Sequence, residues 1–425
     1  MKKLIFAGLL LAASPLLWAQ KGEKAFQVKE ADRIISFLAS DEMRGRRVFS
    51  PEIDKAADFI ADEFKAAGLQ PMGTGFRQEF ILVRPRFVSA AASFNGTAIE
   101  QKNIIVVTCE KQFKASQSSG FEKVMIPAGV NLQAEARKYA RGNKNTLVVV
   151  DKSFANSFGN LARLKSSLFK TNTNTIFVLA DALPEQWTVE AVHEITEQKM
   201  ANVVGVLPGK SKKEEYVIFS GHYDHIGVGR PVEGDSIYNG ANDDAAGTTA
   251  VILLAKYFKE LNDNERTLVF AAFTAEESGG YGSQYFSKQF NPDQVMAMFN
   301  IEMIGTESKW GKNSAYITGY DKTTMGEILA KDLQGTSFTF YPDPYPAQQL
   351  FYRSDNATLA RVGVPAHTIS TSKMDIEPHY HKPSDEVKTL DLDNMVMVVK
   401  AIGLSAKSIV AGKETPSRVK VEELR

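Results

Sequence analysis

Four apolar runs of strand length lie in the middle of the chain, and they constrain its fold more than any other feature. They read "ANVVGVLPG", "EYVIFSGHYDH", "TLVFAAFTA" and "AMFNIEMIG" and lie between residues 201 and 305. A helical pattern at 245–261, "AAGTTAVILLAKYFKEL", separates the second run from the third, and another lies near 390–410. Strands that alternate with helices predict an α/β sandwich, in which helices cover a central sheet.

The region before these runs has a different composition. Its strand-like runs, "NIIVVTC", "TLVVVD" and "TIFVLAD", are separated by polar stretches rich in Lys, Ser and Asn. A chain of 425 residues is long enough for two domains, or for one large domain with an insertion. We therefore predict an inserted, mainly β or α/β, domain at 81–198 within a main domain formed by 21–80 and 199–412. Residues 413–425, "KETPSRVKVEELR", are charged and are expected to form a loose tail.

Residues 1–20 resemble a secretory signal peptide. Lys2 and Lys3 precede the apolar run "LIFAGLLLAASPLLWA", which ends in small residues, so cleavage is expected after Ala19 or Gln20. The run is too short for a comfortable membrane span. We expect an exported protein, periplasmic or secreted, that has no contact with the membrane once the signal is removed.

Charge balance and cysteine content limit the partners and the metal ligands that this chain can use. Fifty basic residues balance fifty acidic ones, so no bulk attraction to nucleic acid or to an anionic membrane is expected. Cys109 is the only cysteine in the chain. A metal site would therefore have to use histidines and carboxylates.

Residues able to bind a metal follow the predicted strands or precede a helix. His222 and Asp224 are two residues apart, so both project from one face of a strand. Asp243 precedes the 245–261 helix, where an ordinary helix cap is an equally simple interpretation. Glu302 lies among Met, Phe and Ile, and an acid buried there needs a partner. His381 precedes a proline turn.

Glu276 and Glu277 are adjacent acids at the end of another apolar run. Adjacent strand residues point to opposite faces, so the two carboxylates are expected to serve different purposes. A solvated loop is the ordinary explanation of such a pair, and only the other motifs argue against it.

Five of these side chains together suit a metal centre: His222, Asp243, Glu277, Glu302 and His381. Their nitrogen and oxygen ligands are of the kind that Zn²⁺ and its neighbours prefer. The three carboxylates carry three negative charges, so two divalent ions with a bound hydroxide give a neutral site. One ion would leave a net negative charge, and two divalent metal ions are therefore expected.

The order of "GHYDHIG", "GANDDAAG", "FTAEESGGYGS", "NIEMIG" and "YHKPSD" resembles the co-catalytic zinc aminopeptidase family. This family includes bacterial leucyl aminopeptidases, aminopeptidases S and Y, and relatives of glutamate carboxypeptidase II. The resemblance covers most of the chain outside the predicted insertion. It implies a mixed, twisted sheet flanked by helices, with two Zn²⁺ ions at the strand ends and peptides as substrates.

The resemblance also implies a role for each motif residue. His222 and Glu302 would bind one metal ion, His381 and Glu277 the other, and Asp243 would bridge the two. Asp224 would orient His222, and Glu276 would be the general base that activates water. Tyr380, next to a ligand, is placed to donate to a developing oxyanion, although a structural role is equally plausible.

Two departures from the family pattern bear on these roles. Glu302 stands where many members have Asp, and Asn356 stands where His is common. The four remaining histidines are expected to be structural or to support the ligands, and they are His193, His225, His367 and His379.

Other functions on the same scaffold stay open from sequence alone. A carboxypeptidase would need a basic group for the substrate carboxylate, and Arg353 is the one candidate in the motifs. A glutaminyl cyclase-like acyltransferase would work with one zinc ion, and Glu302 is compatible with it, although the presence of both His222 and His381 argues against it. A non-catalytic binding protein would have lost ligands, yet all five positions are filled. The insertion faintly resembles a protease-associated domain and would act as a lid, a pocket wall or a spacer.

Overall fold

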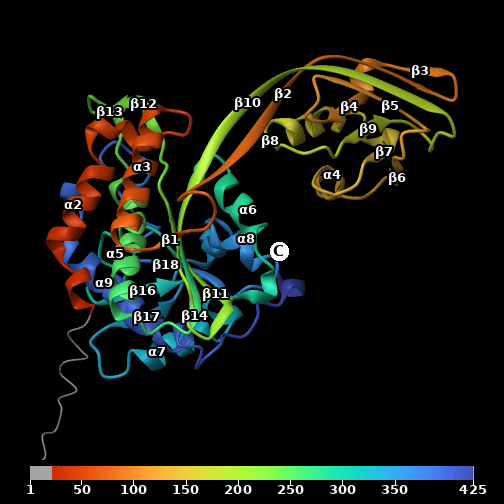
Figure 1. Cartoon of the computed structure of the whole chain (residues 1–425). Coiled ribbons are helices and arrows are strands. Elements are labelled where there is room, and N and C mark those ends of the chain that lie inside the picture. The colour runs from red at the N-terminus through yellow and green to blue at the C-terminus, as the bar shows by residue number, and fades with distance from the viewer. Residues whose placement is uncertain (1–21, 425) are drawn as a thin grey trace, which may run out of the picture. The chain divides into compact units, whose positions relative to one another are not determined.

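The computed structural model describes residues 22–424, which form two compact units (Figure 1). The first unit combines the described residues up to Gln78 with Ala201 onward, and the second is Glu79–Met200. The predicted signal peptide lies outside the described residues. No described helix is both long enough and apolar enough to cross a membrane.

The first unit is built on a mixed sheet, as predicted. Its strands lie in the order β17-β16-β18-β15-β11-β14-β10. Neighbours β18, β15, β11 and β14 run parallel, whereas β10 is antiparallel to β14 and β16 is antiparallel to β18. The bounds are β10 Trp187–Leu207, β11 Lys212–His222, β14 Arg266–Phe273, β15 Val295–Ile301, β16 Ser314–Ile317, β17 Thr339–Pro342 and β18 Ala366–Ser370. The short β1, Gln70–Pro71, pairs with β10, and β12, Gly227–Val232, forms a hairpin with β13, Asp235–Tyr238.

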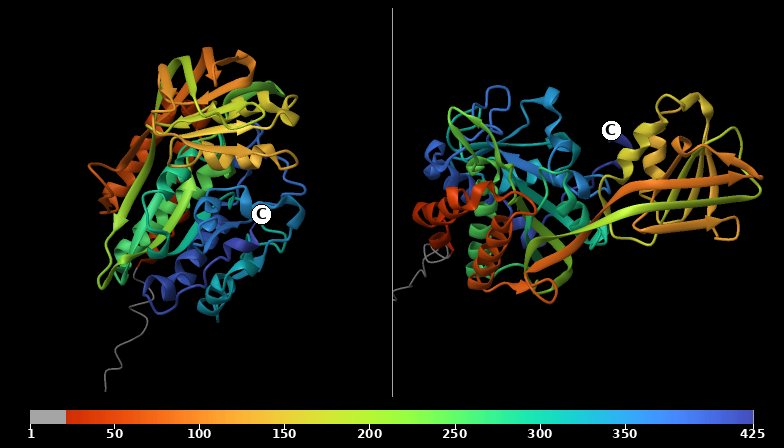
Figure 2. Two further views of the ribbon diagram at one scale, coloured as in Figure 1. Left: turned by 90° about the vertical axis from the view of Figure 1, so that its right-hand side faces the viewer. Right: turned by 90° about the horizontal axis from the view of Figure 1, so that it is seen from above.

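Helices cover both faces of this sheet (Figure 1, Figure 2). The larger apolar core packs α2 (Val28–Leu38), α3 (Pro51–Ala66), α5 (Ala246–Leu261), α7 (Met325–Asp332) and α9 (Leu392–Ser405) against one face. A smaller core joins α6 (Tyr281–Ser287) and α8 (Asn356–Ala360) to the other face. Alternate residues of β11 serve the two cores: Phe219 faces the first and Ile218 the second. Because both faces are covered, β14 is buried along its whole length and β11 is buried from Val217 to His222.

The last residues of the chain are packed rather than loose. Val419 is buried against the smaller core, and the short α10 (Lys407–Val410) precedes this segment. Arg418 donates to the carbonyls of Pro292 and Val295, and Arg266 donates to the carbonyl of Glu414. The expectation of a loose tail was wrong because Val419 is buried and Arg418 binds two backbone carbonyls of the first unit.

The second unit has its own sheet, in the order β4-β9-β7-β6. The bounds are β4 Ile104–Val107, β6 Glu122–Ile126, β7 Thr146–Val150 and β9 Thr175–Leu179, and α4 is Leu132–Ala140. Strands β2 (Arg77–Phe94), β3 (Thr97–Ile99), β5 (Gln112–Ser116) and β8 (Leu168–Phe169) complete the unit, with the first part of β10 paired to β5. Two apolar clusters of its own stabilise this unit.

The chain leaves and re-enters the first unit at adjacent points. Strand β2 carries it out after Gln78, and β10 brings it back at Ala201. The Asn202 side-chain amide donates to Gln78 Oε1 at 2.9 Å, so the two crossing points lie side by side within the first unit.

Candidate metal centre

The carboxyl ends of β11, β14 and β15 meet at one edge of the first unit's sheet. His222 is the last residue of β11, Glu302 directly follows β15, and Glu276 and Glu277 lie just beyond β14. Since parallel strands end at a common edge, side chains from separate segments converge there. The turn before α5 adds Asp243, and a loop after β18 adds His381.

Asp243 occupies the middle of the cluster. Its Oδ1 lies 3.1 Å from His222 Nε2, and its Oδ2 lies 3.2 Å from His381 Nε2. His381 Nε2 is also 3.2 Å from Glu277 Oε2. His222, Asp243 and Glu302 each offer one ligand atom within 4.8 Å of the others. The two oxygens of one carboxylate therefore serve two neighbouring sets of ligands.

A further histidine, His225, belongs to the second set. Its Nδ1 lies 2.8 Å from Glu277 Oε1, and His225, Asp243 and Glu277 form a second group within 4.8 Å. Sequence reasoning placed His225 among structural or supporting histidines. It follows the end of β11, where strand periodicity no longer indicates which way a side chain points.

Buried atoms without hydrogen bonds show that this cluster fits cations. Among the described residues, His222 Nε2, Glu277 Oε1, Glu302 Oε2 and both ring nitrogens of His225 are buried without a hydrogen-bond partner. His225 Nδ1 and Glu277 Oε1 lie only 2.8 Å apart, yet the two atoms form no hydrogen bond with each other. Buried polar atoms are normally paired, and metal ions shared by these ligands would satisfy them.

Burial and the neighbouring charges shift the pKa values of the acids and histidines in this cluster. Burial raises the pKa of Glu302 to about 7 and holds that of Glu276 well above its usual range. Burial opposes the charge of Glu277, but His225 and His381 outweigh it and lower its pKa to about 2. Burial likewise opposes protonation of His381, but Asp243 and Glu277 raise its pKa to about 10. Divalent ions would replace the protons that now balance these carboxylates.

A model of "Peptidase family M28" matches residues 202–404. Residues 202–404 belong to peptidase family M28. This confirms the family resemblance predicted from the five motifs.

Two of the curated relatives that this chain resembles are aminopeptidases by name. The chain is 22% identical over 244 residues to "Aminopeptidase YwaD" of Bacillus subtilis, which covers 53% of this chain and 48% of that protein. It is 26% identical over 213 residues to "Leucine aminopeptidase 1" of Trichophyton rubrum, which covers 47% of this chain and 56% of that protein. The chain thus spans about half the length of the curated relatives it matches.

Solved structures share the fold over nearly the whole chain. The aminopeptidase from Aneurinibacillus sp. strain AM-1 superposes with a TM-score of 0.52 at 18% identity, over 95% of this chain and 97% of that one. The peptidase M28 precursor from Shewanella amazonensis gives a TM-score of 0.51 at 16% identity, over 95% and 98%. At such identities the likeness shows the fold alone.

Within the M28 domain, Asp224 contacts His222 through its backbone carbonyl. His222 Nδ1 lies 3.0 Å from the backbone carbonyl of Asp224 and 3.8 Å from its Oδ1. That Oδ1 instead accepts the backbone N–H of Glu276 at 3.0 Å. The carbonyl fixes the imidazole, and the carboxylate joins the end of β11 to the segment that carries the two glutamates.

Asp244 connects three segments that carry ligands, and sequence reasoning gave it no role. Its Oδ2 accepts the backbone N–H of His222 at 3.0 Å. Its Oδ1 accepts the N–H of Gly247 at 3.0 Å and that of Met303 at 3.1 Å. One buried carboxylate thus holds the ends of β11 and β15 and the start of α5 in register.

Two further buried groups hold the turn before α5. Asp385 accepts the backbone N–H of Asn242 at 2.8 Å and of Asp243 at 3.0 Å. The Arg46 side chain, fully buried, donates to the carbonyls of Asn239 at 2.7 Å and Gly240 at 2.9 Å, and also to those of Leu38 and Tyr223.

Gly240 has a φ of 61°, and a Cβ there would meet the His225 ring at 2.5 Å. The backbone that carries Asp243 is therefore held by Asp385 at Asp243 itself and by Arg46 at Gly240.

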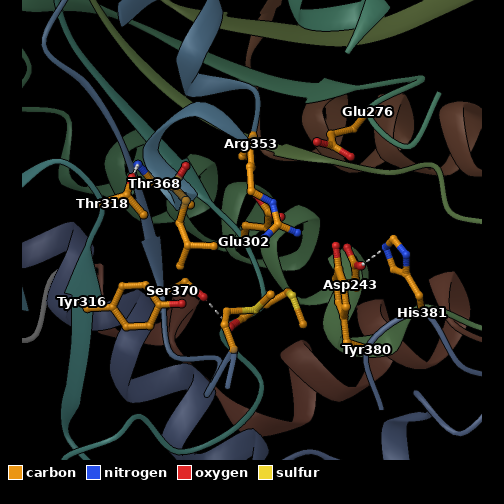
Figure 3. Close-up of a pocket in the computed structure, with 14 residues that line it drawn as sticks. Asp243, Glu276, Glu302, Tyr316, Thr318, Arg353, Thr368, Ser370, Tyr380 and His381 are labelled. Atoms are coloured by element: carbon orange, nitrogen blue, oxygen red, sulfur yellow. Dashed lines mark hydrogen bonds and ion pairs between the residues drawn. The ribbon is translucent and has the colours of Figure 1, made fainter. Parts of the chain in front are cut away.

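A pocket of about 560 Å³, including its open mouth, adjoins the ligands. Glu276 lines it together with Asp243 and Glu302 (Figure 3). Glu277 instead lies beside His225 and His381. The adjacent glutamates thus face different surroundings. The Tyr380 ring also lines the pocket and stacks on His381, with centroids 3.9 Å apart.

Proposed function

We propose that this protein is an exported metal-dependent exopeptidase that removes amino-terminal residues from peptides. The observation that carries the proposal is the sharing of Asp243 between two ligand groups at the edge of an M28 domain. The names of the relatives, aminopeptidase YwaD and leucine aminopeptidase 1, support the choice of substrate end. Export rests on the pattern of residues 1–20.

The ligands divide into two sets in this proposal. His222, Asp243 and Glu302 would hold one divalent ion. Asp243, Glu277 and His381 would hold the other, and His225, which forms a group with Asp243 and Glu277, is a further candidate ligand of that ion. Zinc fits the nitrogen and oxygen donors. Bound there, the two ions would polarise the peptide carbonyl and acidify a water molecule. The second ligand set argues against the one-zinc acyltransferase.

Glu276 is the general base in this mechanism. Its carboxylate lines the pocket, and its backbone is fixed by the Asp224 carboxylate at 3.0 Å. It takes a proton from the attacking water and returns it to the leaving amine. Tyr380, which faces the same pocket, donates from its hydroxyl to the oxyanion of the tetrahedral intermediate.

Three forms of one peptide test the proposal: free, N-acetylated and C-amidated. An aminopeptidase cleaves the free and amidated forms and not the acetylated one. Cleavage of the acetylated form combined with failure on the amide would identify a carboxypeptidase. Each assay is repeated after dialysis against a strong chelator and after Zn²⁺ is restored, because the proposed reaction requires the metal.

A further inference from the structure

Arg353 lines a pocket that also contains acidic side chains, yet its guanidinium forms no ion pair among the described residues. It follows the short helix Leu350–Tyr352, and its exposed side chain points into the pocket (Figure 3). Its one side-chain hydrogen bond runs from Nη1 to Gln348 Oε1 at 3.2 Å. Among the described residues, no carboxylate lies within ion-pair distance, 4.0 Å, of its guanidinium.

Three other arginines of the first unit bind carboxylates. Arg33 binds Glu30 and Glu63, Arg77 binds Asp54 and Asp58, and Arg266 binds Glu215. A guanidinium carries five N–H donors in a planar fork that matches a carboxylate. Most of the donors of Arg353 are therefore available to a molecule in the pocket.

Three hydroxyl groups that line the same pocket donate their hydrogens to other protein atoms. Tyr316 donates to the Ser372 carbonyl at 3.0 Å, and Thr368 donates to Asn356 Oδ1 at 2.9 Å. Ser370 donates to the Met303 carbonyl at 3.2 Å. These three oxygens are left as acceptors, whereas the Arg353 guanidinium offers charged N–H donors to a substrate anion.

The pocket thus brings an unpaired cation beside the candidate metal ligands and general base. Asp243, Glu276 and Glu302 line the pocket together with Arg353, whose guanidinium attracts an anion. We infer that Arg353 recognises a substrate carboxylate, and this inference rests on the proposed aminopeptidase function. The carboxylate comes either from an amino-terminal Asp or Glu side chain or from the carboxyl terminus of a short peptide.

Matched substrates separate these two sources. Aspartyl and asparaginyl anilides have the same shape and differ in charge, and leucyl-glycine differs from leucyl-glycinamide only in its terminal carboxylate. The kcat/KM ratio within each pair is measured for the wild type, Arg353→Gln, Arg353→Lys and the control Arg361→Gln. Arg361 is exposed at the end of α8 and lies outside the pocket lining.

A charge-assisted hydrogen bond to a carboxylate predicts that Arg353→Gln lowers one of the two ratios about 10- to 100-fold. Arg353→Lys keeps part of the preference, and Arg361→Gln keeps all of it. A fall in the aspartyl ratio assigns the carboxylate to the substrate side chain, and a fall in the dipeptide ratio assigns it to the carboxyl terminus. Titration calorimetry with free aspartate and asparagine repeats the first comparison without turnover.

Equal ratios in the wild type and Arg353→Gln for both pairs would overturn the inference. Rapid cleavage of leucyl substrates in that case would leave the aminopeptidase proposal intact. Failure on every substrate with a free amino group, together with cleavage of N-acetylated peptides, would instead overturn the proposed function.

Discussion

Glu276 and Glu277 are neighbours in the chain, yet only Glu276 faces the pocket. We expect Glu276→Gln to keep both metal ions and to slow turnover by about 10² or more, because a general base contributes this much. Glu277→Gln should lose metal, since a neutral amide is a weaker ligand than a carboxylate. Turnover is measured by steady-state kinetics and metal content by elemental analysis of the dialysed variants.

Circular dichroism of both variants controls for folding. The same loss of metal in Glu276→Gln and Glu277→Gln would contradict the separate roles.

Asp244 is expected to act on the metals without touching them. Asp244→Asn replaces one acceptor oxygen with an amide, so a backbone N–H of His222, Gly247 or Met303 loses its partner. We predict metal affinity about 10- to 100-fold weaker, as for other residues that orient ligands. Affinity is measured by competition with a chelating dye.

Asp332→Asn is the matched control, since Asp332 accepts one backbone N–H, that of Ser408, at 2.9 Å and lies outside the metal-binding groups. Equal metal affinities for the two variants would show that Asp244 only stabilises the fold.

Local sequence patterns identified some residues of the candidate metal centre and missed others. His222 and Glu302 were recognisable because each polar residue stands next to an apolar strand. Asp244 and Asp385 act through backbone N–H groups of distant segments, and no local pattern reports such contacts. The roles of His225 and Arg46 likewise depend on contacts with segments distant in sequence, which no local pattern indicates.

At the scale of elements, buried His193 of β10 makes the second unit sensitive to acid. Its Nε2 lies 3.2 Å from Lys165 Nζ, and the Lys165 ammonium lies 4.9 Å from the centre of the Phe87 ring. Burial, followed by the charge of Lys165, lowers the pKa of His193 to about 4. The unfolded chain therefore takes up a proton near pH 6.5, whereas the folded unit resists it.

Stability from His193 is present above pH 6.5 and is lost as the pH falls toward 4. We expect this residue to account for about 2–3 kcal/mol of the loss in the free energy of unfolding. In His193→Gln the loss between pH 7 and 4 should be smaller by that amount. Urea unfolding is followed by fluorescence of Trp187, which is buried in the second unit, in a chain whose Trp18 and Trp310 are replaced by Phe. Parallel pH profiles for the two chains would refute the assignment.

Elements were easier to predict than their limits. The helix predicted at 245–261 is α5, Ala246–Leu261, because an apolar helix between two buried strands leaves little choice. Strand β10 was harder, since its residues 187–194 alternate between buried and exposed while 202–205 are all buried. The change from one-sided to two-sided burial marks the boundary between units within a single strand. No turn signal accompanies it.

At the scale of the whole molecule, both candidate metal groups of the described residues lie in the first unit. Chelation should therefore destabilise that unit selectively, by about 3–4 kcal/mol if the metal is present at 100 to 1,000 times its dissociation constant. Hydrogen exchange followed by mass spectrometry should show faster exchange in β11, β14 and β15 and no change in β7 and β9. Added Zn²⁺ should reverse the effect, and equal acceleration in both units would contradict it.

The adjacency of Gln78 and Asn202 has a consequence for the history and the engineering of this chain. Their side chains are joined at 2.9 Å, so a turn of a few residues could connect the two positions without disturbing the sheet around them. The intervening 79–200 segment contains its own apolar clusters. Residues 79–200 could therefore be replaced by another folded segment, in evolution or by a protein engineer. The candidate metal ligands would be kept, because they lie outside this segment.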